Sequence, residues 1–355
     1  MASGVTVESR DWGQLPSGEA VRHFTLRDGL GLEIGLSNYG ATLTSIRMAD
    51  RWGRIDDILL GFDTLGGYMA PAFQASWPYF GSTVGRFANR IAGAAFTIDG
   101  VRHKLHANEG ENQLHGGPHG FDRVVWRAEL REASDGVRLH HVSPHGDQGF
   151  PGRLEIQLDV RIEPGELVLR ATASTDAPTH INLTSHGYFN LAGRAARSIE
   201  GHVLTIPADA VIPIDEAALP VGTPLPVDAT PFDLRTPTRI GDALAGVHPQ
   251  LLIGDGFNHC FVLRAGTEPS ATLRDPGSGR WLELRTTEPG LQLYSANAFD
   301  GAMADGDGRP FIRRQAIALE AQHFPDSPNR PDFPSTLLRP GESWCSETRL
   351  RFGAD

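Results

Sequence analysis

Residues 153–161 read Arg-Leu-Glu-Ile-Gln-Leu-Asp-Val-Arg, a strict alternation of polar and apolar side chains. Successive side chains of a β-strand point to opposite faces of the sheet, so the apolar residues of this stretch share one face. These residues are Leu154, Ile156, Leu158 and Val160. The stretch therefore predicts a strand with one buried and one solvated face.

The same alternation recurs in short segments along most of the chain, at 41–48, 124–130, 166–174, 202–207, 280–286 and 347–352. Gly, Pro, Asp and Asn, which favour turns, separate these segments. Helical spacing is weak and short, and is clearest at 240–245. Signals this short do not fit the crossover helices that a parallel sheet requires. We expect an all-β fold, an antiparallel sandwich with few short helices. No fixed-period repeat or linker divides the chain, so we expect a single domain over residues 1–355.

Composition and charge narrow the functional classes. The chain has 355 residues, 40% hydrophobic and 21% charged, with a net charge of −11. A protein with this negative net charge offers no positive electrostatic potential to attract a nucleic acid or an anionic membrane surface, so we expect neither as a partner. Residues 1–20 lack the basic start and apolar run of a secretory signal, and no stretch approaches about 18 apolar residues. We expect a cytoplasmic protein.

Two strand-like segments carry polar side chains where an ordinary core strand would be apolar. In 181–186 the alternation places His186 on one face with an Asn and a Thr. In 315–324 it places Glu320 and a Gln on one face with two alanines, whose small side chains leave room for a ligand. Both segments therefore indicate a polar surface or cleft.

Two further segments group donors and acceptors of hydrogen bonds. Residues 85–91 contain Asn89 and Arg90 beside an apolar residue. Residues 112–117 contain His115 followed by two glycines, which allow close approach of the backbone to whatever His115 contacts. These three side chains are candidates for binding a polar ligand.

Each candidate also has an ordinary structural explanation, because a lone strand His or Glu more often serves the core or the solvated surface. Ser185 precedes His186, but neighbours on a strand point to opposite faces, so we expect no nucleophile–His pair. Paired histidines elsewhere lack carboxylate or thiol neighbours at ligand spacing, and two cysteines are too few for a structural zinc site. We expect no metal.

The sequence resembles the galactose mutarotases, or aldose 1-epimerases, along nearly its whole length. The blocks that carry the resemblance include 38–42 (NYGAT), 85–91 (GRFANRI), 114–117 (LHGG), 186–191 (HGYFNL), 232–235 (FDLR) and 319–322 (LEAQ). Several such blocks in the same order make chance agreement negligible.

The resemblance implies a β-supersandwich with the sugar in an open cleft. It implies that His186 is the proton donor and Glu320 the proton acceptor, and that Asn89, Arg90 and His115 contact the sugar. General acid/base catalysis of this kind opens and recloses the sugar ring without a metal or a cofactor. The implied substrate is a small free aldose such as galactose or glucose, and the expected assembly is a monomer or a homodimer.

Two positions depart from the family pattern and bear on sugar recognition. Many members have Asp where this chain has Asn258, within 256–259 (GFNH), and some have Gln at the position that we assign to Glu288. We count both as substrate-binding residues. An amide loses the charge-assisted hydrogen bonding of a carboxylate, so the preferred sugar stays open.

Three other functions remain alternatives. A glycoside hydrolase needs two carboxylates about 5 to 9.5 Å apart, for which Glu320 has only Glu288 or Asp326 as a partner. A sugar-phosphate 1-epimerase needs a cluster of basic residues, of which Arg86 and Arg90 are the only signs. A non-catalytic sugar-binding protein would use the same cleft.

Overall fold

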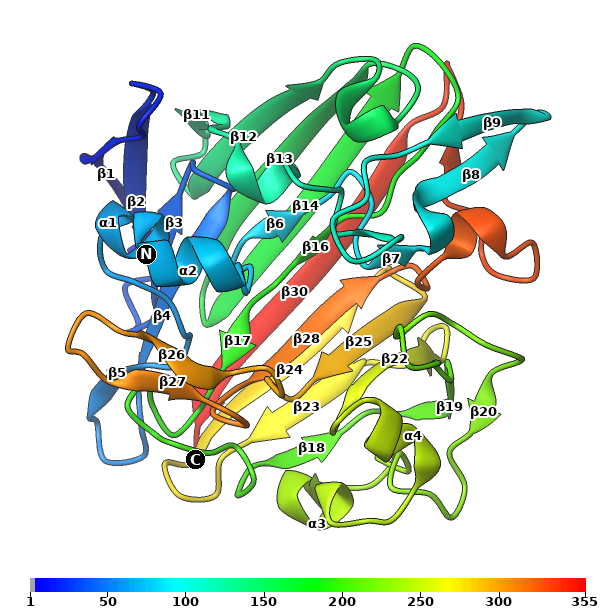
Figure 1. Ribbon diagram of the computed structural model, residues 1–355. Coiled ribbons are helices and arrows are strands. Elements are labelled where there is room, and N and C mark those ends of the chain that lie inside the picture. The colour runs from blue at the N-terminus through cyan, green and yellow to red at the C-terminus, as the bar shows by residue number, and fades with distance from the viewer. Residues whose placement is uncertain (1–3) are drawn as a thin grey trace.

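The computed structural model describes residues 4–355, and most of its regular structure is β-strand (Figure 1). Neighbouring strands of the three large sheets pair antiparallel. The all-β antiparallel fold expected from the alternation is therefore confirmed. No helix within the described part of the chain is long and apolar enough to cross a membrane.

The largest sheet has nine strands in the order β11-β12-β13-β14-β30-β24-β23-β18-β21. Their bounds are β11 Arg127–Leu130, β12 Gly136–Ser143, β13 Leu154–Glu163, β14 Glu166–Thr175, β18 Val203–Thr205, β21 Thr238–Arg239, β23 Ala271–Arg274, β24 Arg280–Thr286 and β30 Trp344–Ala354. The C-terminal strand β30 lies in the middle of this sheet, between β14 and β24.

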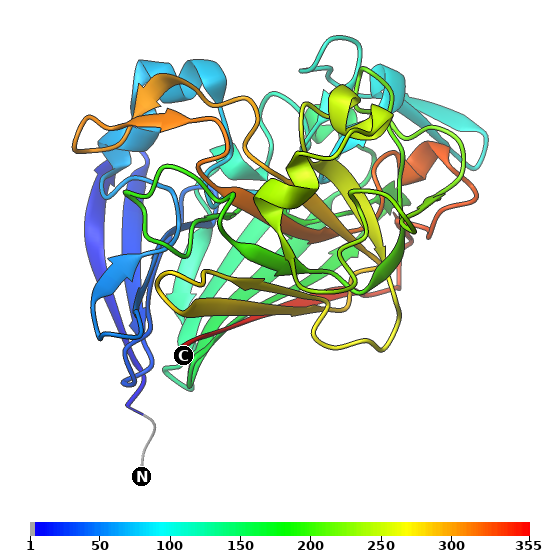
Figure 2. The same ribbon diagram turned by 90° about the horizontal axis from the view of Figure 1, so that it is seen from below.

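A six-stranded sheet in the order β17-β28-β25-β22-β19-β20 lies over the central part of the nine-stranded sheet (Figures 1 and 2). Its strands are β17 Tyr188–Phe189, β19 Ala208–Val211, β20 Leu225–Pro226, β22 Asn258–Leu263, β25 Gly290–Tyr294 and β28 Ile317–Gln322. Leu291 and Leu319 from this sheet share one hydrophobic cluster with Leu158 and Leu350 from the larger sheet. The two sheets thus form a sandwich, and the opposite face of β28, β25 and β22 is free to form a site.

A five-stranded sheet stands at the side of the sandwich and contains the N-terminal strands (Figure 1). It consists of β1 Thr6–Gln14, β2 Ala20–Arg27, β3 Glu33–Ser37, β4 Thr42–Ala49 and β5 Ile55–Asp57. The remaining strands form two-stranded ribbons: β6 Thr83–Val84 with β16 Thr184–Ser185, β7 Arg90–Ile91 with β10 Gln113–Leu114, β8 Ala95–Ile98 with β9 Val101–Lys104, β15 Thr179–His180 with β29 Leu337–Leu338, and β26 Asp300–Ala304 with β27 Pro310–Ile312.

The helices are few and short, as the sequence predicted. They are α1 Leu65–Met69, α2 Pro71–Ser76, α3 Ile240–Leu244 and α4 Pro249–Ile253. Only α3 had a recognisable sequence signal. The main hydrophobic cluster runs from Phe24 to Phe352 and includes residues of all three large sheets, which supports our proposal that the chain folds as one domain.

The alternating stretch 153–161 lies in β13 from Leu154 onward, and its four apolar residues are buried as expected. The opposite face is not fully solvated, because Asp159 is also buried. Arg138 donates to the Asp159 carboxylate at 2.8 Å, and Arg131 pairs with the same carboxylate. A buried carboxylate needs such partners, so two arginines from the neighbouring chain segments explain this departure from the simple alternation.

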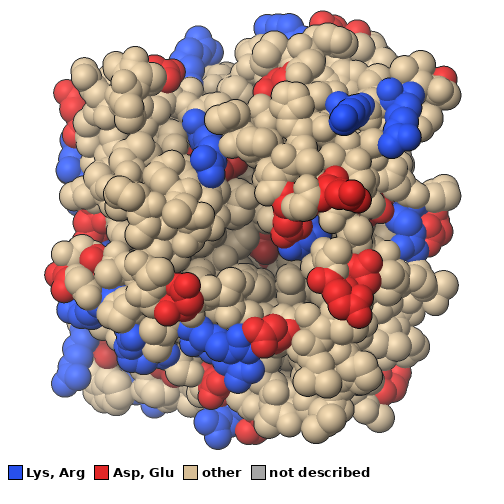
Figure 3. Space-filling view, in the orientation of Figure 1, with Lys and Arg blue, Asp and Glu red and all other residues tan. Residues whose placement is uncertain are grey.

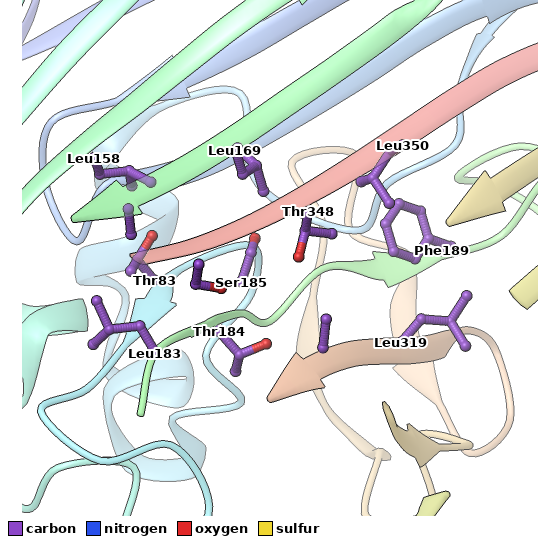
Figure 4. A pocket seen from close by; sticks show the side chains of 13 residues that line it. Thr83, Leu158, Leu169, Leu183, Thr184, Ser185, Phe189, Leu319, Thr348 and Leu350 are labelled. Carbon is purple, nitrogen blue, oxygen red and sulfur yellow. The ribbon is translucent and has the colours of Figure 1, made fainter. Parts of the chain in front are cut away.

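Between the two layers of the sandwich lies a small internal cavity of about 50 Å³ (Figure 4). Leu158 and Leu169 line it from the larger sheet, and Leu319 lines it from β28. Ser185 also lines it, whereas the next residue, His186, lines the opposite cleft. The cavity thus lies directly behind the strands that carry the candidate catalytic residues.

We expect Ala171→Val to stabilise the protein by about 1 kcal/mol. Ala171 on β14 lines the cavity, so two added methyl groups would bury apolar surface without displacing neighbours. Ala173→Val is the matched control: Ala173 is buried on the same face of the same strand but does not line the cavity. Overpacking there should cost about 1–3 kcal/mol. Chemical denaturation measures both changes, and equal destabilisation by both would contradict a void at Ala171.

Candidate active site

A cleft of about 300 Å³ opens on the outer face of the six-stranded sheet, and Figure 3 shows the hollow in the middle of this face of the molecule. Its volume is at the lower end of the range for small-molecule sites. Its lining residues are Ser76, Trp77, Pro78, Tyr79, Asn89, Arg90, Glu109, Leu114, His115, His186, Tyr188, Asn258, Gln292, Tyr294, Ala298, Phe299, Met303 and Glu320. Aromatic rings and hydrogen-bonding groups together make up most of this lining, which suits a polar ligand with apolar faces.

Three adjacent strands supply the floor of the cleft. Glu320 on β28 lies opposite Gln292 on β25, and Asn258 at the start of β22 lies opposite Tyr294 on β25. The alternation that sends Leu319 into the sandwich core sends Glu320 into the cleft. Gln292 Nε2 donates to Asn258 Oδ1 at 2.9 Å, so the two amides hold each other in place.

The two alanines on the face of Glu320 do not leave room for a ligand. Ala316 and Ala318 belong to a cluster with Phe80, Tyr188 and Phe299, and both alanines are fully buried. The small side chains instead admit aromatic rings, one of which, Tyr188, also lines the cleft.

His186 follows β16 and is fixed between aromatic rings. Its ring stacks on Tyr79 at 5.7 Å and on Tyr188 at 4.9 Å between centroids, and it meets the ring of His115 edge-on at 5.3 Å. Its backbone N–H donates to Ser82 O at 2.8 Å. Packing therefore sets the direction of the imidazole, which points across the cleft at Glu320.

His186 Nε2 lies 3.5 Å from Glu320 Oε2, and both side chains are almost completely buried. Glu320 Oε2 and His186 Nδ1 make no hydrogen bond within the described residues. A buried polar atom without a partner costs free energy, and such atoms are typical of a site prepared for a ligand.

Burial shifts the two pKa values in opposite directions. Loss of solvation raises the pKa of Glu320 to about 8, although the positive charge of Arg90 opposes this shift. Loss of solvation lowers the pKa of His186 to about 4. Both shifts follow from the cost of burying the charged form. Between these values the pair carries a single proton, which burial favours on Glu320.

Asn89, Arg90 and His115 lie together where β7 pairs with β10. The backbone N–H of Asn89 donates to His115 Nδ1 at 3.1 Å, and the N–H of His115 donates to Asn89 O at 3.1 Å. Because Nδ1 accepts a hydrogen bond, the neutral imidazole carries its proton on Nε2. His115 therefore presents an N–H donor to the cleft.

One group of side chains within residues 4–355 could in principle hold a metal ion: His115, His186 and Glu320. Their potential ligand atoms lie within 4.8 Å of one another. A histidine binds a metal through a nitrogen that carries no proton. His115 Nδ1 is occupied by the Asn89 N–H, and its Nε2 carries the proton. The donor set therefore fits a metal poorly.

We expect activity to survive treatment with EDTA followed by dialysis, because side-chain protons suffice for the chemistry. Turnover before and after the treatment measures this. If activity is lost and then recovered on addition of a divalent ion, the histidines must be reinterpreted as ligands.

The structure brings six of the seven candidate site residues into this cleft: Asn89, Arg90, His115, His186, Asn258 and Glu320. Glu288 is the exception, because it does not line the cleft. It lies in the turn between β24 and β25, where its carboxylate pairs with His323 Nδ1 at 2.6 Å. Gln292, four residues later, occupies the cleft instead.

Sequence reasoning also missed the aromatic walls and one acidic residue of the rim. Tyr79, Tyr188 and Tyr294 lie in the cleft, and Glu109 pairs with Arg90 there. Tyr188 and Tyr294 sit on strands next to Glu320, so alternation beside a known site residue could have found them. Tyr79 lies outside the strands with a positive φ of 60°, and no periodic pattern marks it.

Comparison with known proteins identifies the family. Residues 22–351 match the family model described as Aldose 1-epimerase. The chain belongs to the aldose 1-epimerase family. It is 41% identical to galactose mutarotase of Rattus norvegicus over 98% of this chain and 99% of the relative. It is 35% identical to aldose 1-epimerase of Escherichia coli (strain K12) over 96% and 97%.

Solved structures agree with this assignment. Galactose 1-epimerase from Lactobacillus acidophilus NCFM superposes with a TM-score of 0.84 at 26% identity, covering 99% of both chains. Membership of the aldose 1-epimerase family thus accounts for the fold over nearly the whole chain. The activity is that of an aldose 1-epimerase, an isomerase that interconverts the anomers of a sugar.

Proposed function

We propose that the cleft binds a free aldose such as galactose or glucose and that His186 and Glu320 exchange protons with it. The observation that supports these roles best is their geometry. Two titratable side chains, Glu320 on β28 and His186 from the link between β16 and β17, face each other at 3.5 Å within one small cleft. Groups that must transfer protons to and from one substrate need this kind of common access.

The reaction needs one group that takes a proton and one that gives a proton. The base removes the proton from the C1 hydroxyl while the acid protonates the ring oxygen, and the C–O bond of the ring breaks to give the aldehyde. Rotation about the C1–C2 bond turns the aldehyde over. Reclosure then proceeds with the protons moving in reverse and gives the other anomer.

The single proton on the His186–Glu320 pair fits this cycle. Productive binding requires the proton on His186 and an ionised Glu320, although burial favours the proton on Glu320. A C1 hydroxyl that donates to the Glu320 carboxylate, and a ring oxygen that accepts from His186, each stabilise the charged forms. Sugar binding thus shifts the proton to the arrangement that the reaction needs.

The cationic groups favour a free sugar over a sugar phosphate. Arg86 is buried away from the cleft, where it donates to the backbone carbonyls of Pro151 at 2.8 Å and Gly152 at 2.9 Å. Arg90 is the single Arg or Lys in the lining. One guanidinium is less than the basic cluster that a phosphate group usually requires.

The carboxylates also argue against a glycoside hydrolase. The lining contains two, Glu320 and Glu109, but Glu109 is bound in a bidentate ion pair at the rim. Neither Glu288 nor Asp326 lines the cleft. The pair of available carboxylates on either side of a glycosidic bond is therefore lacking among the described lining residues.

Sugar preference depends on the amide pair Asn258 and Gln292, which lies beside Glu320 on the floor of the cleft. Because Gln292 Nε2 donates to Asn258 Oδ1, the Asn258 NH₂ group is left to act as a donor. A sugar hydroxyl that contacts it must accept a hydrogen bond. The names of the relatives, galactose mutarotase and aldose 1-epimerase, make galactose the first sugar to test.

Polarimetry on freshly dissolved anomers of galactose, glucose and other aldoses tests the proposed function. We expect the protein to speed the approach to the equilibrium rotation for at least one free hexose, after subtraction of the spontaneous rate. Tight sugar binding without any acceleration would instead support a non-catalytic sugar-binding protein.

Location and assembly belong to the same proposal. We propose a cytoplasmic enzyme that works as a monomer or a homodimer. Light scattering of the purified protein measures the assembly, and fractionation of cells measures the location.

A further inference from the structure

Among the described residues, Arg90 is the one Arg or Lys that lines the cleft, and an ion pair with Glu109 neutralises its charge. Its Nε donates to Glu109 Oε2 and its Nη2 donates to Glu109 Oε1, both at 2.6 Å. This is the bidentate arrangement in which a guanidinium also binds phosphate. Glu109 therefore occupies the Nε–Nη2 edge of Arg90, one of the two edges through which a guanidinium can bind an anion with two hydrogen bonds.

Hydrogen bonds fix the loop that carries Glu109 to β10 and to the segment that follows β7, the strand of Arg90. Asn108 Nδ2 donates to Leu114 O at 3.0 Å, and Asn108 Oδ1 accepts from the N–H of Leu114 at 2.7 Å. Asn112 Oδ1 accepts from the N–H of Gly93 at 2.9 Å, three residues after Arg90. The hydrogen bonds of these two neighbouring asparagines thus hold Glu109 in place together with its ion pair.

Burial differs between the two partners. The Arg90 side chain is 13% exposed and the Glu109 side chain is 36% exposed, and both line the cleft. Glu109 therefore lies at the rim, between the solvent and the inner cation. An anion that approaches Arg90 must displace this carboxylate or lie beside it, and either costs electrostatic free energy. A neutral hydroxyl meets no such penalty.

We propose that Glu109 is a specificity-determining residue that excludes phosphorylated and other anionic ligands from the cleft by neutralising Arg90. This inference rests on the proposed function, since it concerns selection among sugars by the same site. Arg90 Nη1 makes no hydrogen bond with protein within residues 4–355, so its two N–H groups stay available for neutral sugar hydroxyls. The ion pair thus keeps the geometry of an arginine while removing most of its attraction for anions.

The test measures inhibition of galactose anomer exchange by inorganic phosphate. In Glu109→Gln we expect the inhibition constant for phosphate to fall by about tenfold or more relative to the wild-type protein. The effect should weaken as sodium chloride is added, because it is electrostatic. Calorimetric titration with phosphate should show the same gain in affinity without any reliance on turnover.

Two further variants separate charge from structure. Glu109→Asp keeps the negative charge and should continue to exclude phosphate. Glu111→Gln removes one charge from the same loop at an exposed position outside the cleft. The inhibition constant for phosphate should stay within about twofold of the wild-type value.

Equal phosphate affinity in the wild-type protein and Glu109→Gln would overturn the inference, as would an equal gain in Glu111→Gln. If Glu109→Asp gains phosphate affinity as Glu109→Gln does, the charge of Glu109 is not the cause and the inference also fails. A wild-type protein that does not exchange the anomers of galactose or any other free aldose would instead overturn the proposed function. The calorimetric comparison would still decide the role of Glu109.

Discussion

Replacing Glu320 with Gln should lower kcat for anomer exchange by about 10²-fold or more. The amide keeps the shape of the side chain and can still hydrogen-bond a sugar hydroxyl, but it cannot take up a proton at neutral pH. Galactose affinity should therefore change far less than kcat. Saturation-transfer NMR between the signals of the two anomers measures kcat, and calorimetry measures affinity.

Glu288→Gln is the matched control for this variant. Both glutamates are buried, but Glu288 pairs with His323 outside the cleft. We expect its removal to alter stability more than turnover. Turnover close to the wild-type value in Glu320→Gln would remove Glu320 from the mechanism, and a large loss in Glu288→Gln would reopen the question of its place in the site.

The second large effect is expected for His186→Asn, again about 10²-fold or more in kcat. Asn can occupy the space between the rings of Tyr79 and Tyr188 and can donate a hydrogen bond, but it cannot deliver a proton to the ring oxygen. His106→Asn, at an exposed position outside the cleft, serves as the control and should leave kcat unchanged.

A His186→Asn protein that keeps its kcat would point to another acid. His115 is the nearest candidate, because it presents a protonated Nε2 to the same cleft. Its pKa is lowered well below the usual value by burial, and the charges of His186 and Arg90 act in the same direction. Burial lowers the pKa of both histidines, so the preference for His186 rests on its position, with Nε2 3.5 Å from Glu320 Oε2.

The alternation of the sequence predicted the strands and their faces well. In β28 it correctly separated Leu319, which packs in the sandwich, from Glu320, which enters the cleft. It could not predict that β30 would lie between β14 and β24. Such pairings join segments that are far apart in the chain, and nothing in the local pattern encodes them.

The position of Glu288 outside the cleft could not be predicted for the same reason. Glu288 and Gln292 differ by four positions, so a strand through both would place them on one face. The register with β28 decides between them, because Gln292 lies opposite Glu320 whereas β25 begins only at Gly290. Register depends on the partner strand, which the sequence of β25 alone does not specify.

The dependence of kcat/KM on pH tests the central claim that His186 and Glu320 act as a pair with one shared proton. The constant kcat/KM reports the free enzyme, in which the pKa of Glu320 is raised to about 8 and that of His186 is lowered to about 4. Below the lower value the pair holds two protons and has no base, and above the upper value it holds none and has no acid. We therefore expect kcat/KM for galactose to be highest between about pH 4 and 8 and to fall above pH 8. A value that keeps rising from pH 7 to 10 after subtraction of the spontaneous rate, as for a single base titrating alone, would contradict the account.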